Sequence, residues 1–251
     1  MTTLKFSDVN KQDKIIRLRI LLEELWGMKR VNVQAIQLPA GYSCPMAKDC
    51  LTKSDRETGK ISDGPDMQFR CFMATLEAMS PQLRQLVWHN FDLLREHKTE
   101  DAITELIELS LPKNTHVMRT GVDGDFYSQK YFNAWLNVAR NHPEINFYAY
   151  TKSLSYWINQ IDAIPSNYNL NASKGGRLDH LIEDYNLKSA TVVYHPDQAA
   201  KLGLEIDHDE SHALLSDKSF ALLLHGTQPK DSDASKALKQ LRLEKIEYSY
   251  S

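Results

Sequence analysis

Hydrophobic and polar positions follow a helical period in the first part of the chain. Residues 11–28, with the core KIIRLRILLEELWGM, place large aliphatic side chains on one face and predict an N-terminal helix. Residues 31–38 (VNVQAIQL) then predict a first strand. A helix that begins near residue 71 should break at Ser80–Pro81, because a proline ring obstructs an α-helix interior. It should resume through LRQLVWHNFDLLREH, followed by a further helix over residues 100–109.

From residue 116 onward, short apolar strands alternate with polar turns and helical segments. The expected strands cover residues 116–120, 145–151, 168–172, 190–194 and 220–224. Such a repeat predicts parallel strands with right-handed crossovers. With the first strand it makes six units, which suit a partial (β/α)6 barrel or an open doubly wound sheet. Periodicity does not separate the two, and we predict the partial (β/α)6 barrel with helices on its outer face. Residues 205–217 (EIDHDESHALLSD) do not fit and predict an acidic surface excursion or short hairpin.

Composition narrows the class of protein. The length of 251 residues fits a single α/β domain over residues 1–251. The net charge of -3 provides no basic field, so nucleic-acid binding is not indicated. The polar N-terminus resembles no signal peptide, and no apolar run approaches the roughly 20 residues needed to cross a bilayer. Three cysteines without a secretory signal favour a reducing compartment, so we expect a cytoplasmic protein with no membrane partner.

All three cysteines lie in one segment, residues 38–72, at the spacing C-x5-C-x20-C. Its glycines and prolines predict a long loop after the first strand. Cys44, Cys50 and Cys71 suit a soft metal or an iron–sulfur cluster, since both prefer thiolate ligands. Three ligands would leave one iron of a [4Fe-4S] cubane open to a small-molecule ligand, whereas a closed zinc site needs a fourth ligand such as His89. Alternatively, the cysteines are unrelated small apolar side chains.

Other candidate residues follow the strands, where parallel α/β folds place their sites. We expect Arg119 and Lys152 to face the cysteine segment, where positive charge offsets a cluster or holds an anionic ligand. The candidates after the fourth strand are Asn171, Ser173 and Lys174, the last beside a glycine pair that weakly resembles a phosphate cradle. Cys71 should begin a helix, whose amino terminus lowers a thiolate pKa. His208 and His212 have the spacing of a divalent-metal pair or of a solvated acidic face.

Two resemblances add to this pattern. LPAGYSCPMAKDC, SDRETGKISDGPDMQFRCF, VWHNFDLL, GDFYSQKYFNAWLNVA and FYAYTKS together resemble the phage family Gene product 88, which implies a protein encoded by a phage or prophage but carries no function. THVMRTGVDGDFYSQKYFNAWLNVARNHPEINFYAYTKS is more distantly similar to the strand–helix–strand core of radical SAM proteins. That likeness implies a [4Fe-4S] cluster on Cys44, Cys50 and Cys71, with S-adenosylmethionine chelating the open iron. The usual C-x3-C-x2-C spacing is absent, and so is a glycine-rich run after the second strand.

Three kinds of function therefore stay open. The first is an iron–sulfur enzyme with an open iron, either radical SAM-like or non-redox. The second is a binding protein stabilised by zinc or a cluster. The third is a metal-free enzyme or interaction protein. The sequence specifies neither the substrate nor the oligomeric state.

Overall fold

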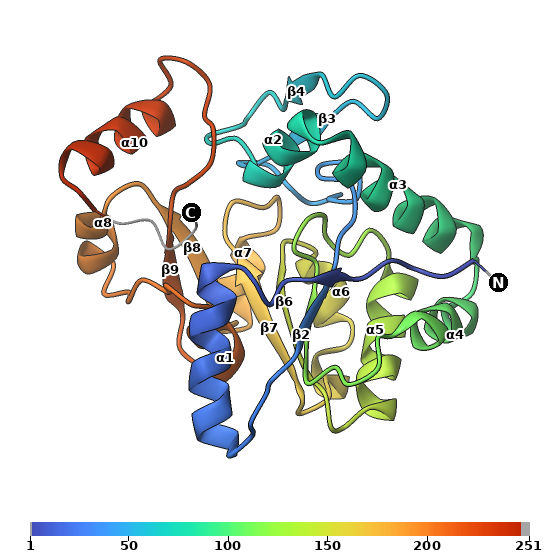
Figure 1. The fold of residues 1–251 in the computed structure, drawn as a ribbon. Coiled ribbons are helices and arrows are strands. Elements are labelled where there is room, and N and C mark those ends of the chain that lie inside the picture. The colour runs from blue at the N-terminus through green and yellow to red at the C-terminus, as the bar shows by residue number, and fades with distance from the viewer. Residues whose placement is uncertain (1, 247–251) are drawn as a thin grey trace.

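A seven-stranded sheet runs through the computed structural model, which describes residues 2–246 (Figure 1). The strands lie in the order β1-β2-β5-β6-β7-β8-β9, with β1 antiparallel and all others parallel. Their bounds are β1 Ser7–Asp8, β2 Val33–Ile36, β5 Val117–Thr120, β6 Asn146–Thr151, β7 Tyr168–Ser173, β8 Ser189–Val193 and β9 Phe220–Leu223. The six expected strands and their parallel pairing are confirmed. The sheet is open, with β1 and β9 as its edges, and the antiparallel edge strand β1 was not anticipated.

Helices connect the strands, and all but α9 begin near the positions that the sequence indicates. They are α1 Asp13–Trp26, α2 Phe72–Met79, α3 Pro81–Glu96, α4 Glu100–Ser110, α5 Gln129–Asn141, α6 Leu154–Ile158, α7 His180–Asp184, α8 Pro196–Lys201, α9 Ser211–Leu215 and α10 Asp233–Leu243, with a 3-10 turn at Ile161–Ala163. The predicted break is confirmed, because the Ser80 hydroxyl accepts from Leu83 N and Pro81 opens α3. Within residues 2–246, no helix has the length and apolar character needed to cross a membrane.

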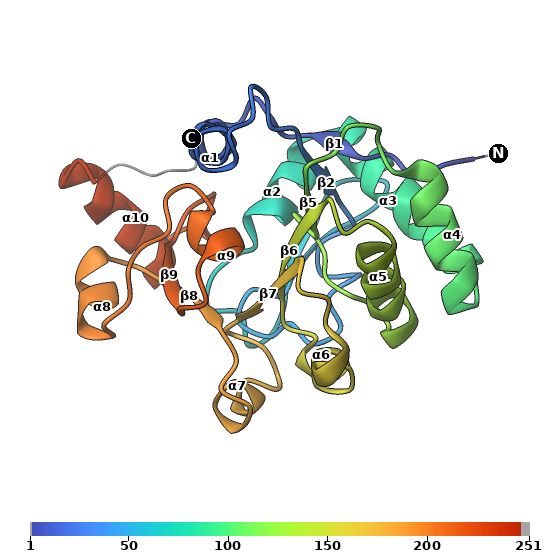
Figure 2. The same cartoon turned by 90° about the horizontal axis from the view of Figure 1, so that it is seen from below.

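Helices cover both faces of the sheet (Figures 1 and 2). A separate hydrophobic cluster is packed on each face. Ile36, Met118 and Phe147 pack against helices α3 to α6 on one face. Val33, Val117 and Tyr148 pack against α1 and α9 on the other. Alternate residues of β2, β5 and β6 thus supply the two clusters, as a pleated strand requires. Residues of β8 and β9 also pack in a third cluster with α8 and α10. The expectation that all helices lie on one outer face was wrong, since the N-terminal helix covers the opposite face.

The acidic segment 205–217 is built into the fold rather than forming a surface excursion. Its helix α9 packs against β6 and β7, and Ala213 and Leu214 are buried. Asn171 Nδ2 donates to Ala213 O at 3.1 Å and fixes α9 to the sheet. Glu210 is 2% exposed. Two buried apolar residues amid acidic ones are too short a signal for a periodic pattern, which explains why the surface prediction was wrong.

The cysteine segment between β2 and α2 is more ordered than the expected loop. It contains a hairpin of β3 (Thr52–Ser54) and β4 (Ile61–Asp63), whose turn is held by Asp55 Oδ1 accepting from Thr58 N at 2.8 Å. The Arg56 guanidinium lies 4.8 Å from the centre of the Trp88 ring and docks the hairpin on α3. Only three residues form each strand, so their pattern was masked by the turn residues around them.

Close approach of two backbones fixes the base of this segment against the turn after β5. Gly124 has φ +73, and a Cβ there would meet the Ser43 hydroxyl and lie 2.7 Å from Leu38 Cβ. Leu38 N also donates to Asp123 O at 3.2 Å. Gly203 has a similar φ of +67, but a Cβ there would have no atom within 4 Å.

These two glycines make a matched pair for a stability test. Gly203→Ala should lower the free energy of unfolding by about 1 kcal/mol, the cost of a left-handed φ. Gly124→Ala should cost about 1–3 kcal/mol more, because the added methyl also overpacks the turn. Urea unfolding of both variants measures the difference. Equal losses would show that the turn can move away from the cysteine segment.

Candidate functional site

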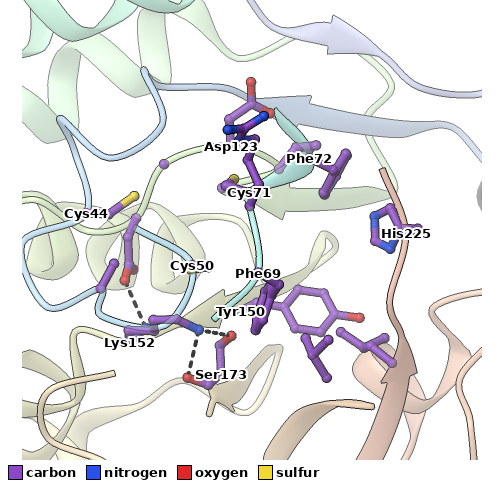
Figure 3. A pocket seen from close by; sticks show the side chains of 18 of the residues that line it. Cys44, Cys50, Phe69, Cys71, Phe72, Asp123, Tyr150, Lys152, Ser173 and His225 are labelled. Carbon is purple, nitrogen blue, oxygen red and sulfur yellow. Dashed lines mark hydrogen bonds between the residues drawn. The ribbon is translucent and has the colours of Figure 1, made fainter. Parts of the chain in front are cut away.

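An open cavity lies where the carboxyl ends of β5 to β9 face the cysteine segment (Figure 3). It encloses about 1050 Å³, including space open to solvent. Cys44, Cys50 and Cys71 all line it. The segment and the strand ends therefore meet at one site, the position typical of parallel α/β folds.

Hydrogen bonds at or next to each cysteine fix the local backbone. Ser43 N and Oγ donate to Pro39 O at 3.1 and 2.8 Å, which makes the turn before Cys44. Next to Cys50, Asp49 N donates to Gly175 O at 2.9 Å in the turn after β7. Cys71 is the residue before helix α2, as expected, and its N–H donates to Thr52 Oγ1 at 3.3 Å.

The thiols of Cys44 and Cys71 sit in an environment that favours their protonated form. Burial raises the pKa of Cys71 to about 12, and the neighbouring Cys50 adds to the effect. The N–H groups of Ala74 and Met73 at the start of α2 oppose this rise but do not overcome it. The pKa of Cys44 is also raised, by burial first and then by Asp125, Cys50 and Cys71. The expected lowering of the Cys71 pKa was wrong, because burial outweighs the helix terminus.

Lys152 and Ser173 line the cavity, but they are hydrogen-bonded to each other. Lys152 Nζ donates to Ser173 Oγ at 2.6 Å, to Ser173 O at 3.1 Å and to Lys174 O at 2.9 Å. Asp125 accepts from Lys152 N at 2.8 Å and from Thr151 Oγ1 at 2.6 Å. These contacts join the ends of β6 and β7 (Figure 3) and use all three ammonium hydrogens of Lys152.

The glycine pair after β7 holds the cysteine segment instead of forming an open cradle. Gly175 N and Gly176 N donate to the Asp179 carboxylate at 2.7 and 2.8 Å. Arg177 N donates to Met46 O at 2.9 Å, and residue 47 forms an isolated bridge with Gly176. Lys174 and Asn171 are not among the residues that line the cavity.

A buried charge cluster forms another part of the cavity wall. Lys14 from α1 and Arg119 from β5 both make ion pairs with the Glu210 carboxylate, and Tyr148 donates its hydroxyl to the same group. Burial would raise the pKa of Glu210, but the charges of Arg119 and Lys14 outweigh it and hold the pKa at about 2. Lys14 and Glu210 were not among the site residues predicted from the sequence. Lys14 lies four residues before Leu18, so the helical pattern already placed it on the buried face.

His89, named as a possible fourth zinc ligand, lies away from the cavity, whereas His225 lines it. His89 Nε2 lies 2.9 Å from Thr3 O, and His89 does not line the cavity. His225, after β9, does line it, with its ring 4.4 Å from that of Phe72. Burial lowers the pKa of His225 to about 4, which leaves a neutral imidazole at pH 7.

Among residues 2–246, no set of three or more His, Cys, Asp or Glu side chains is arranged so that it could hold a metal ion. His212 Nε2 lies 2.9 Å from the Glu205 carboxylate. Because Asp207 and Glu210 are buried, residues 205–217 do not form the solvated acidic face that was one of the two predictions for this segment. The three cysteines share the cavity without forming such a group in the described structure.

Two buried carboxyl groups accept hydrogen bonds from residues 37 and 40, at the start of the cysteine segment. Glu77 on α2 accepts from Ala40 N at 2.8 Å, and Asp123 accepts from Gln37 Nε2 at 3.2 Å. Burial raises the pKa of Glu77 to about 8 and that of Asp123 to about 7. Each carboxyl also has one oxygen without a hydrogen-bond partner among the described residues.

Comparisons with known proteins point to phages. The family model described as Gene product 88 matches residues 7–241. The Gene 88 protein of Mycobacterium phage L5 is 30% identical over 128 residues, and that of phage D29 is 29% identical over 128 residues. Each match covers 47% of this chain, and the chain spans about half the length of these curated relatives (47%). No solved structure matches significantly, and the radical SAM likeness stays a prediction.

Glu77→Gln should stabilise the protein at pH 8 but not at pH 5. Folding raises the pKa of the Glu77 carboxyl from 4.5 to about 8. The stabilisation that comes from this shift is fully present below the unfolded pKa and is lost as pH rises through the folded pKa of about 8. The neutral amide removes that loss, for a gain of about 1–3 kcal/mol in unfolding free energy at pH 8. Urea unfolding at both pH values measures it. The exposed Glu57→Gln is the control, and a gain at neither pH would contradict the prediction.

Proposed function

The chain belongs to the phage family Gene product 88, and from that premise we propose that it is an iron–sulfur protein. Cys44, Cys50 and Cys71 would bind a [4Fe-4S] cluster and leave one iron open to a small-molecule ligand. The observation that supports this most is that every thiol of the chain lines one cavity at the carboxyl ends of the strands.

The donor set fits a cluster better than a single ion. A cubane takes each thiolate on a different iron, so it does not need three ligands gathered around one point. The raised pKa values of Cys44 and Cys71 mean that iron would replace protons on binding, so binding should strengthen with pH. The N–H groups at the start of α2 and the positive charges of Lys14 and Arg119 would stabilise the negative cluster.

Residues of this chain would then bind and orient the ligand. When bound, the cluster would supply an open iron as a Lewis acid or electron donor. Phe69, Phe72 and Tyr150 line the cavity and would limit the access of water. S-adenosylmethionine is the first candidate ligand, from the resemblance to radical SAM proteins and from a strand order that follows the sequence, as in a partial barrel. The cytoplasm of the infected host would keep the thiols reduced.

One observation favours a second candidate, a binding protein whose cysteine segment is held by zinc or by a closed cluster. His225 lines the same cavity as the cysteines and is neutral at pH 7, the form in which imidazole binds metals. In this case His225 would be the fourth ligand in place of His89, and no iron would be open.

Anaerobically purified protein should be brown and contain about four irons and four sulfides per chain, as a [4Fe-4S] cluster requires. Each of Cys44→Ser, Cys50→Ser and Cys71→Ser should lose the colour. Met46→Leu is the matched control, because it removes a sulfur from the same segment outside the cavity lining. Stoichiometric zinc without iron and sulfide would overturn the cluster and favour the second candidate.

The open iron has a separate test. Added S-adenosylmethionine should change the EPR spectrum of the reduced cluster if it binds that iron. A cluster whose spectrum no added ligand changes would indicate a fourth protein ligand. His225→Ala should then open the iron and alter the spectrum.

A further inference from the structure

The hydroxyl of Ser173 is held at the cavity by a buried ammonium group. Lys152 Nζ donates to Ser173 Oγ at 2.6 Å, and Lys152 is only 6% exposed. The same ammonium donates to Ser173 O and to Lys174 O, so its three hydrogens are all directed at atoms of the chain. Ser173 is the last residue of β7 and is half-buried, and both side chains lie on the cavity wall (Figure 3).

The surrounding structure fixes Lys152 in this position. Asp125 accepts a hydrogen bond from Lys152 N at 2.8 Å, which holds the backbone at the end of β6. A Cβ at Gly176 would lie 3.2 Å from Lys152 Cβ, so the turn after β7 packs closely against the base of the lysine side chain. The backbone of Ser173 is in turn fixed by its pairing with Ala190 in β8. The ammonium therefore meets the Ser173 hydroxyl from one fixed direction.

A hydroxyl oxygen that accepts a hydrogen bond must direct its own proton elsewhere. Among the described residues, the hydrogen bond that involves Ser173 Oγ is the one it accepts from Lys152. Because Ser173 lines the cavity, its proton can be donated to an acceptor placed there. Donation by the ammonium also polarises the hydroxyl, and in a chain of hydrogen bonds such polarisation strengthens the next bond.

The cavity wall also carries a large apolar surface. The apolar residues that line it include Phe69, Phe72, Val192, Leu222, Leu223 and Leu224. All three hydrogens of Lys152 are directed at the chain, so this point of the wall presents one uncharged donor, the Ser173 hydroxyl. A single uncharged donor suits a carbonyl oxygen. A ligand that fits both features has an apolar body and one carbonyl group.

We propose that Ser173 is a binding residue of the cavity and donates its hydroxyl proton to the carbonyl oxygen of a small, mainly apolar ligand. Lys152 is a positioning residue, because it acts on the ligand only through Ser173. The inference rests on the proposed function only in that both concern the same cavity. Neither Ser173 nor Lys152 is a proposed cluster ligand, so the carbonyl site does not require bound iron.

Acetophenone and ethylbenzene are matched probes, because they share a carbon skeleton and differ by one carbonyl oxygen. Isothermal titration calorimetry of the full chain measures the affinity of each. Ser173→Ala should weaken acetophenone by about fivefold, the usual contribution of one uncharged hydrogen bond, and leave ethylbenzene unchanged. Ser173→Thr keeps the hydroxyl and should retain the affinity for acetophenone. The proposal is overturned if Ser173→Ala changes both affinities equally, if it leaves acetophenone unchanged, or if the unaltered protein does not bind acetophenone.

Two further variants separate positioning from a merely structural role. Lys152→Met keeps the length of the side chain but removes the ammonium, so acetophenone should weaken by about threefold while ethylbenzene does not. Ser153→Ala is the matched control, because the Ser153 hydroxyl donates to Phe126 O at 2.8 Å and Ser153 does not line the cavity. It should leave the ratio of the two affinities unchanged.

Circular dichroism confirms that each variant is folded. Equal weakening of both probes by Lys152→Met would reject the positioning role of Lys152 and show that it only joins the strands. If Lys152→Met does not fold, Ser173→Ala and Ser173→Thr decide the matter, and loss of acetophenone binding in both would reject the hydroxyl as the donor.

Iron and sulfide assays on the same samples keep the two proposals apart. Acetophenone binding that depends on Ser173, in protein that never acquires iron, would reject only the iron–sulfur function. A [4Fe-4S] protein in which Ser173→Ala changes neither affinity would reject only the carbonyl site.

Discussion

The interaction on which the site depends most is the ion cluster around Glu210. It joins α1, β5, β6 and the segment 205–217, which are far apart in the sequence. Removing one partner would leave an uncompensated buried charge, which typically costs about 3–5 kcal/mol. The cluster therefore holds α1 and α9 on one face of the sheet and places charged side chains on the cavity wall at the same time.

The cysteine segment depends on a different kind of contact, backbone against backbone. Gly124 and Gly175 let the turns after β5 and β7 approach it closely, and Asp49 N and Arg177 N donate hydrogen bonds across that contact. Such contacts set position without supplying charge. Three thiols are thereby held at the cavity by the rigid ends of the sheet, although most of the segment around them is irregular.

Sequence patterns predicted the parts of the fold that repeat. Six strands, their parallel pairing, the N-terminal helix and the break at Ser80–Pro81 all follow from periods or from proline chemistry. The edge strand β1 has two residues and the hairpin strands three each, too few to show a period. Helix α9 was missed because its apolar residues are flanked by acidic ones whose burial depends on distant cations.

Only the part of the site that follows from the order of the strands could be predicted from the sequence. Strand ends placed Arg119, Lys152 and Ser173 near the cysteines, since parallel strands end at one edge of a sheet. The strand order did not indicate that the Lys152 ammonium donates a hydrogen bond to Ser173, because that bond depends on how far the side chain extends from one strand to the next. Nor did it indicate the partner of Arg119, which comes from a segment outside the repeat. A cation at a strand end is therefore available to a ligand only to the extent that neighbouring carboxylates leave its charge uncompensated. In this cavity Lys14 and Arg119 both pair with the carboxylate of Glu210, so their position in the sequence alone does not say how either cation would meet a ligand.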